Sequence, residues 1–332
     1  MTKNILCNIG EEITLNIGGK FQVVTEADLL NRVNQIYRIQ FSEAPQKKHL
    51  ELVINILKSN SKMDLRFYGN YSENSIDWKS LNFVENLQID LWETNNLEEI
   101  KDLHNLKKLG ISKNVKSTVS LKILENLNKL EILYTSISKD VDKVGSLQSL
   151  KFLTLREIKT KNLDFLSKLK NLTDIWLTLG SYEDINGITQ VENLRKLSIH
   201  QIRNFDNEEL NSIISNCKHL TALELQNLKN LSQINFVNKL NNLSYLYLDA
   251  NKNIETFKDI NNSKSLKTLV TSNSRPLDKV LIYLENVENV FLGDSYPKSE
   301  IEKFSKDFKG KNLWIHGKEI IGKHEYENPF LK

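Results

Sequence analysis

The sequence contains few of the residues that cross-link or bend a chain. Its 332 residues include only 2 cysteines, 4 prolines and 12 glycines. Cys7 and Cys217 cannot form a disulfide framework, which is typical of proteins from reducing compartments. No apolar run reaches the ~20 residues that span a membrane, and residues 1–19 hold no apolar run of signal-peptide length. We therefore expect a soluble cytoplasmic protein that does not bind membranes.

The charge of the chain gives no reason to expect a nucleic-acid partner. It has 45 basic and 42 acidic residues, for a net charge of +3, and only seven of the basic residues are arginine. Arginine is the usual reader of phosphates and bases, and a balanced charge attracts neither nucleic acid nor anionic lipid. The many Asn, Lys and Ile residues are typical of an AT-rich bacterial genome, so we expect a bacterial protein.

The sequence also lacks motifs for catalysis. It has no glycine-rich phosphate loop and no H-E-x-x-H, G-x-S-x-G or C-x-x-C pattern. Cys217 and His219 are the one pair whose spacing suggests metal binding, but Cys217 precedes Leu220 by three residues, which favours a core position over a metal site. We expect no enzymatic activity, no cofactor and no metal.

What the chain does contain is a repeat of about 22 residues. In residues 163–177, LDFLSKLKNLTDIWL, apolar residues recur three apart and then two apart, which indicates a 3₁₀ or helical turn followed by a short strand. An L-x-x-L-x-L core at this period is the signature of leucine-rich repeats. Thirteen copies of the repeat follow one another at steps of 20 to 26 residues. The position three residues before each strand centre is occupied by Ile36, Lys62, Val84, Leu106, Leu130, Leu150, Leu172, Leu194, Leu220, Leu243, Leu266, Val287 and Gly310.

With this core, residues 36–316 resemble bacterial leucine-rich repeat proteins that have repeats of about 22 residues, such as the internalins. The resemblance implies an α/β right-handed solenoid, a horseshoe with a concave parallel β-sheet and convex short helices or 3₁₀ turns. It also implies that the concave face binds proteins. That family usually has Asn five residues after the second Leu of the core, where its amide bonds the backbone of neighbouring loops. Only Asn114 and Asn251 hold this place; the others are Trp92, Ser138, Ile158, Gly180, Ile202, Leu228, Ser274 and Ser295.

We expect residues 1–332 to form a single solenoid domain with a cap at each end. Residues 1–25 contain two alternating apolar runs joined by Gly18 and Gly19, which predicts an N-terminal β-hairpin cap. Residues 26–316 hold about thirteen repeats, with true helices expected over 26–34, 46–58, 206–217 and 299–308. Residues 317–332 are the predicted C-terminal cap, because an open solenoid edge invites association. The residues expected to cover that edge are Ile320, Ile321, Phe330 and Leu331.

Alternation along the strands identifies the side chains that point away from the core. Thirteen strands roughly 4.8 Å apart would present a face on the order of 60 Å long. Solvated sheet faces seldom collect aromatic residues, and a contiguous aromatic patch usually marks a contact surface, although single aromatics are also ordinary strand formers. The aromatic residues at these positions are Tyr134, Phe152, Trp176, Tyr245, Tyr247, Phe291 and Trp314. A polar rim is expected from Arg156, Asp174, His200, Glu224 and Asp249.

These observations favour a non-catalytic scaffold that binds a protein partner on the concave sheet face, and we expect the scaffold to be a monomer. One alternative is an inhibitor or immunity-type protein that occludes a toxin or an enzyme. Another is a carbohydrate-binding module, since Trp and Tyr stack on sugars, but a cytoplasmic location argues against it. An effector with a catalytic domain is disfavoured, because residues 317–332 contain no cysteine nucleophile.

Overall fold

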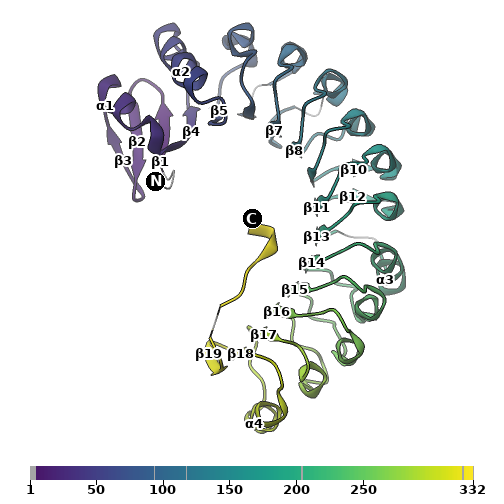
Figure 1. Ribbon diagram of the computed structural model, residues 1–332. Coiled ribbons are helices and arrows are strands. Elements are labelled where there is room, and N and C mark those ends of the chain that lie inside the picture. Colours follow the sequence, from purple (N-terminus) through teal and green to yellow (C-terminus); the bar gives the residue numbers. More distant parts are fainter. Residues whose placement is uncertain (1–4, 93, 117, 203–204, 324, 332) are drawn as a thin grey trace. The chain divides into compact units, whose positions relative to one another are not determined.

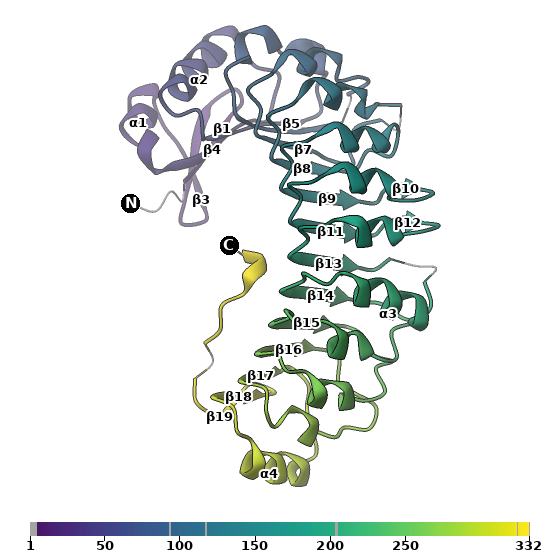
Figure 2. The same ribbon diagram turned by 45° about the vertical axis from the view of Figure 1, so that its right-hand side comes forward.

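The computed structural model describes residues 5–92, 94–116, 118–202, 205–323 and 325–331 (Figure 1). The chain divides into two compact units, unit 1 from Met1 to Ile158 and unit 2 from Lys159 to Lys332. In both units a short strand is followed by a loop and then by a helical turn, as the repeat spacing predicts. The helices and the strands lie on opposite sides of each repeat (Figure 2).

The α-helices agree closely with those expected from the sequence. Helices α2, α3 and α4 begin and end within one residue of the predicted bounds, while the predicted helix over 26–34 is divided into α1 and a 3₁₀ turn. The α-helices are α1 (Glu26–Asn31), α2 (Lys47–Ser59), α3 (Asn207–Asn216) and α4 (Lys298–Asp307). The Asp206 side chain caps α3 by accepting a hydrogen bond from the backbone N–H of Glu209.

Most of the other repeats have a 3₁₀ turn in place of an α-helix, because apolar residues three apart match three residues per turn. In unit 1 these turns are Val33–Gln35, Glu73–Ser75, Trp78–Leu81, Glu98–Asp102, Leu121–Asn126 and Val141–Ser146. In unit 2 they are Asp164–Lys168, Asn186–Gln190, Asn235–Lys239, Lys258–Asn262 and Ile282–Leu284, and a further 3₁₀ turn, Pro329–Leu331, lies beyond the repeats.

The sheet of unit 1 is parallel apart from the strands at its N-terminal edge. Its strands are β1 (Ile5–Ile9), β2 (Ile13–Ile17), β3 (Lys20–Val23), β4 (Ile36–Phe41), β5 (Asp64–Gly69), β6 (Asn86–Leu91), β7 (Lys108–Ile111), β8 (Ile132–Thr135) and β9 (Phe152–Arg156). Strands β4 to β9 pair in parallel in chain order. The expected hairpin is β2 and β3, and it joins β4 through a further strand. Strand β1 lies between them, antiparallel to β2 and parallel to β4.

The main sheet of unit 2 is also parallel. Its strands are β11 (Asp174–Thr178), β13 (Lys196–His200), β14 (Ala222–Gln226), β15 (Tyr245–Asp249), β16 (Thr268–Ser272), β17 (Asn289–Leu292), β18 (Asn312–Ile315) and β19 (Lys318–Ile321). Strands β11 to β18 pair in parallel, and β19 pairs antiparallel with β18. Two short strands, β10 (Lys159–Thr160) and β12 (Ser181–Tyr182), form a separate parallel pair.

The core of each repeat lies between its strand and its helical turn. In the 163–177 repeat, Leu166, Leu172, Ile175 and Leu177 are all 0 % exposed. Burying such a side chain contributes about 1.5–3 kcal/mol. The rows of leucines stacked along the chain therefore hold the repeats together, and the side chains between them on each strand are left to point outward.

The loops after the unit 2 strands satisfy their backbone groups mostly without the Asn side chain that the resemblance leads one to expect. Leu179, Gln201, Asn227 and Ala250 each follow a strand and have positive φ values, between 50° and 57°. In this left-handed conformation, each backbone N–H donates to the carbonyl of the last residue of the next strand, at 2.8–2.9 Å. Asn251 adds the expected amide contacts at one place, to the N–H of Leu228 and the carbonyl of Leu225.

The C-terminal segment covers more than the edge of the sheet. Strand β19 covers the open side of β18, as predicted for Ile320 and Ile321. Phe330 and Leu331, however, do not lie at that edge. After β19 the chain turns back, and Phe330 reaches Trp176 on β11, while Leu331 is 84 % exposed (Figures 1 and 2). The expectation that these two residues cover the last edge is therefore wrong.

Candidate functional site

The candidate site in unit 2 is its exterior sheet face, the face of strands β11 to β18 that points away from the core. The parallel register aligns its side chains into rows, because equivalent residues of neighbouring strands lie side by side. The middle row consists of Trp176, Ser198, Glu224, Tyr247, Val270, Phe291 and Trp314. The row beside it begins with Asp174, Lys196, Ala222 and Tyr245.

Four residues of these two rows form a second apolar cluster outside the solenoid core. Ala222, Tyr245, Val270 and Phe291 are only 1–8 % exposed, although all four point away from the core. Tyr247 and Trp314 pack against the cluster and are partly buried. Four of the seven expected aromatic residues, Tyr245, Tyr247, Phe291 and Trp314, therefore lie together, but Tyr245 and Phe291 are covered.

The cover is the C-terminal tail, defined here as residues 325–331. The Tyr326 ring lies on Phe291, with ring centroids 4.6 Å apart, and 6.3 Å from Tyr245. The Phe330 ring lies 6.1 Å from Tyr245 and 6.0 Å from Trp176. These separations are typical of favourable aromatic pairs. The tail therefore lies across the exterior face from β17 to β11.

Polar contacts fix the far end of the tail. The Lys196 Nζ donates to the Pro329 carbonyl at 2.8 Å and also pairs with Asp174 Oδ1 at 3.3 Å. Asn328 Oδ1 accepts from the Phe330 N–H at 2.9 Å. Lys196 was not among the predicted site residues. Its position on the strand was known from the alternation, but its tail partner was not.

Burial raises the pKa values of the tyrosines of this face. It raises the pKa of Tyr247 to about 12, with smaller contributions from Asp249 and Glu224. Burial also raises the pKa of Tyr245, whose hydroxyl is hydrogen-bonded to that of Tyr326. Tyr245 and Tyr247 therefore stay uncharged well above physiological pH. The predicted polar residues His200, Glu224 and Asp249 lie on the same strands and are partly exposed.

Three of the predicted site residues lie in unit 1. Tyr134 is 38 % exposed and packs on Phe152, with ring centroids 5.2 Å apart. Burial raises the pKa of Tyr134. Arg156 is exposed and pairs with Glu157 at 3.2 Å. These residues form a small open aromatic pair with a neighbouring charge.

The remainder of the unit 1 face is a polar network that the predicted site did not include. Asp64 pairs with Arg38 and with Lys108, at 3.0 Å each. Arg66 pairs with Asp90 and donates to Gln40 Oε1 at 3.2 Å. The alternation had placed these side chains outside the core, but it did not show that opposite charges would meet.

Unit 1 also has an exposed aromatic corner that the predicted site missed. Trp92 is 48 % exposed and lies edge-on to Tyr68, with ring centroids 6.2 Å apart. The guanidinium carbon of Arg66 lies over the Tyr68 ring, 4.6 Å from the ring centroid. Trp92 occupies the first loop position after β6. The strand pattern used to select site residues does not extend to that position.

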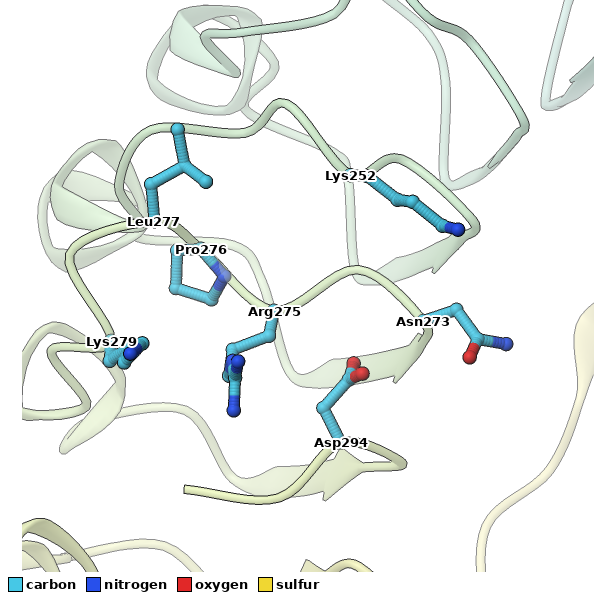
Figure 3. A pocket seen from close by; sticks show the side chains of 7 residues that line it. All are labelled: Lys252, Asn273, Arg275, Pro276, Leu277, Lys279 and Asp294. Atoms are coloured by element: carbon cyan, nitrogen blue, oxygen red, sulfur yellow. The ribbon is translucent and has the colours of Figure 1, made fainter. Parts of the chain in front are cut away.

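A hollow of about 260 Å³ lies among the loops of unit 2 (Figure 3). Its lining residues are Lys252, Asn273, Arg275, Pro276, Leu277, Lys279 and Asp294. Arg275 Nη1 donates to the Ser295 carbonyl at 2.6 Å, and Asp294 Oδ2 accepts from the Ser274 N–H at 2.9 Å. Because both side chains hold neighbouring loops in place, we assign the hollow a structural role.

Within the described residues, no three His, Cys, Asp or Glu side chains are grouped to hold a metal ion. Cys217 is buried, its Sγ lies 3.5 Å from the Ile213 carbonyl, and burial raises its pKa to about 12. This is the core position that its spacing from Leu220 indicated. Among the helices of the described segments, none has the length and apolar character needed to cross a membrane.

Comparison with known proteins identifies the fold. No protein-family model matches the sequence, and no curated protein matches it. Among solved structures, an internalin (InlF) of Listeria monocytogenes has a TM-score of 0.59 at 16% identity, covering 89% of this chain and 83% of the internalin. The TLR13–ssRNA13 complex has a TM-score of 0.52 at 20% identity, covering 81% of this chain and 41% of that chain. With the strand-and-turn repeat described above, these likenesses show that the chain is a leucine-rich repeat solenoid with the internalin-like fold.

Proposed function

We propose that this protein is a non-catalytic binding module that holds a protein partner on the exterior sheet face of unit 2. The observation that carries the proposal is that this face already accommodates a stretch of polypeptide. Aromatic rings on β11, β15 and β17 receive two ring side chains of the tail, and Lys196 binds one of its backbone carbonyls. Solenoid proteins commonly use such an extended face for binding.

The chemistry of the face also supports a protein partner. Interface hot spots are rich in Trp, Tyr and Arg and lie in desolvated pockets surrounded by polar groups. Trp176, Tyr247 and Trp314 are half-buried members of the middle row. The ion pair between Lys196 and Asp174 stands beside them and can orient a backbone carbonyl. A cytoplasmic location, with Cys7 and Cys217 as free thiols, is part of this proposal.

The test is affinity capture from cell lysate with three forms of the full chain. These are the wild type, the exterior-face variant Trp176→Ala/Tyr247→Ala, and the control Lys168→Ala/Gln190→Ala. The control changes two exposed residues on the helical turns Asp164–Lys168 and Asn186–Gln190. Captured proteins are identified by mass spectrometry, and circular dichroism confirms that each variant is folded.

We expect a partner that the wild type and the control both retain and that the exterior-face variant loses. Truncating a central aromatic hot spot costs roughly 2 kcal/mol or more, so affinity should fall about 30-fold for each ring. A partner held equally by all three forms would show that binding takes place elsewhere on the solenoid.

A further inference from the structure

The tail contacts the exterior face of unit 2 through a small number of well-defined groups. The Tyr326 ring occupies a place between Phe291 and Tyr245, and the Phe330 ring occupies a place between Tyr245 and Trp176. Between the two rings the tail is irregular at Glu327 and Asn328, and it enters the 3₁₀ turn Pro329–Leu331 just before the second ring. The face therefore presents two aromatic receiving positions that share Tyr245.

The spacing of these two positions matches four residues of extended chain. The Tyr326 position lies between β17 and β15, and the Phe330 position lies between β15 and β11, so their centres are about two and a half strand steps apart, or about 12 Å. Four residues can span at most about 14 Å, so a segment that fills both positions must be nearly extended. An α-helix would advance only about 6 Å over the same four residues. The geometry therefore selects an extended segment over a helical one.

The tail covers the face but remains at the surface itself. Val270 and Phe291 of the sheet are 8 % and 1 % exposed, whereas Leu331 of the tail is 84 % exposed. Glu325 and Glu327 are also exposed, and Tyr326 and Phe330 are only partly buried. Fixing the backbone of each tail residue costs conformational entropy, which opposes the gain from two partly buried rings. Such a segment can leave the sheet without disturbing the leucine core beneath it.

We propose that the tail is a displaceable internal ligand, and that the partner binds by inserting an extended segment with two aromatic side chains four residues apart. This inference rests on the proposed function and specifies its partner. The partner segment replaces Tyr326 and Phe330 at their two positions and presents a backbone carbonyl to Lys196. While the tail is bound, it lowers the apparent affinity of the face for that segment.

The size of this effect follows from the tether. A segment joined to the face by a short flexible link has an effective concentration in the millimolar range. If the free segment binds with a dissociation constant on the order of 100 μM, an attached copy reduces the apparent affinity of a competitor by about tenfold or more. Removing the two rings of the tail should therefore raise the apparent affinity of the competitor by about tenfold or more.

The probe is a fluorescent peptide with the sequence of residues 322–332, GKHEYENPFLK. Its binding is measured by fluorescence anisotropy to the full wild-type chain and to the full chain with Tyr326→Ala/Phe330→Ala. Matched control peptides carry both alanine substitutions, or have the second aromatic moved next to the first. Because the substituted residues lie in the tail, the repeats of both chains should have the same circular dichroism spectrum.

We expect saturable binding to the Tyr326→Ala/Phe330→Ala chain, at least tenfold weaker binding to the wild type, and no binding of either control peptide. Equal binding to both chains would refute the internal-ligand role of the tail. Absence of binding to either chain, or equal binding of the control peptides, would refute the proposed partner chemistry. A wild-type dimer that becomes monomeric with the tail substitutions would assign the face to the tail of a second copy and overturn the partner proposal.

The outcome is separable from that of the capture experiment. If the Trp176→Ala/Tyr247→Ala chain loses a partner but the probe binds both chains equally, the proposed binding face stands. Only the proposal that the tail competes with the partner is then refuted. Conversely, tail-dependent probe binding without any partner lost by the exterior-face variant would leave the peptide site in place and remove the proposed cellular role.

Discussion

The contribution of Asn251 to the stability of the unit 2 loops can be predicted quantitatively. Asn251 is 0 % exposed, its Nδ2 donates to the Leu225 carbonyl at 2.7 Å, and its Oδ1 accepts from the Leu228 N–H at 2.9 Å. Asn251→Ala leaves both backbone groups buried without their partner. Each buried unsatisfied group costs about 1–3 kcal/mol, so the free energy of unfolding should fall by roughly 2–6 kcal/mol for the two groups.

The chain offers a matched control at the equivalent place of another repeat. Asn114 stands at the same position of its repeat but is exposed, so Asn114→Ala should change stability by less than about 0.5 kcal/mol. Both variants are compared with the wild type by urea unfolding monitored by circular dichroism. Equal losses for the two variants, or a loss below about 1 kcal/mol for Asn251→Ala, would refute the assignment of Asn251 as the anchor of its loop.

Three further outcomes follow from backbone geometry and burial. Ala250→Gly should raise the free energy of unfolding by about 0.5–1 kcal/mol, since Ala250 has φ 54° and glycine adopts this conformation without a Cβ clash; a destabilised variant in urea unfolding would contradict this. Gly187→Ala should lower the free energy of unfolding by about 1–3 kcal/mol, because the new Cβ would lie 2.2 Å from the Leu163 carbonyl oxygen; an unchanged melting temperature would count against that close approach. Cys7 and Cys217 should react with a thiol reagent at pH 8 only after unfolding, since burial raises both pKa values to about 12 and leaves on the order of one thiolate in 10⁴; rapid labelling of the native chain would show that the thiols are accessible.

The repeat architecture was predictable because its signal is periodic. Apolar residues at fixed spacing dictate which side chains pack inward, and Leu166, Leu172 and Ile175 are buried as their positions require. The same alternation correctly placed Trp176, Tyr247 and Trp314 on the exterior face. The bounds of α3 also followed from the sequence, because Leu210, Ile213 and Ile214 recur at helical spacing and are buried.

The cover over the exterior face was not predictable, because alternation shows where a side chain points and not what lies against it. Phe291 was expected to be open, yet it is 1 % exposed under the ring of Tyr326. The tail lies outside the repeat, so no period relates its residues to particular strands. Tyr326 and Phe330 were the available signal, since aromatic residues in a segment without periodicity need a surface to pack on.

The N-terminal edge and the loops were missed for related reasons. Ile5, Cys7 and Ile9 alternate as a strand should, but their partner β4 is more than two dozen residues away and is paired in parallel. Nothing local in the sequence specifies such a pairing. In the loops, Leu179 and Ala250 adopt positive φ without being glycine. Their conformations are imposed by the neighbouring strand ends, to which their N–H groups donate.

The central claim is that the tail lies on the exterior face of unit 2, and photo-cross-linking from position 330 tests it most directly. The full chain carries benzoylphenylalanine in place of Phe330, and the cross-linked peptides are mapped by mass spectrometry after irradiation. We expect intramolecular cross-links to β11 and β15, at or beside Trp176 and Tyr245, which lie 6.0 and 6.1 Å from the Phe330 ring. Cross-links confined to β18, β19 or the helical turns would contradict the account.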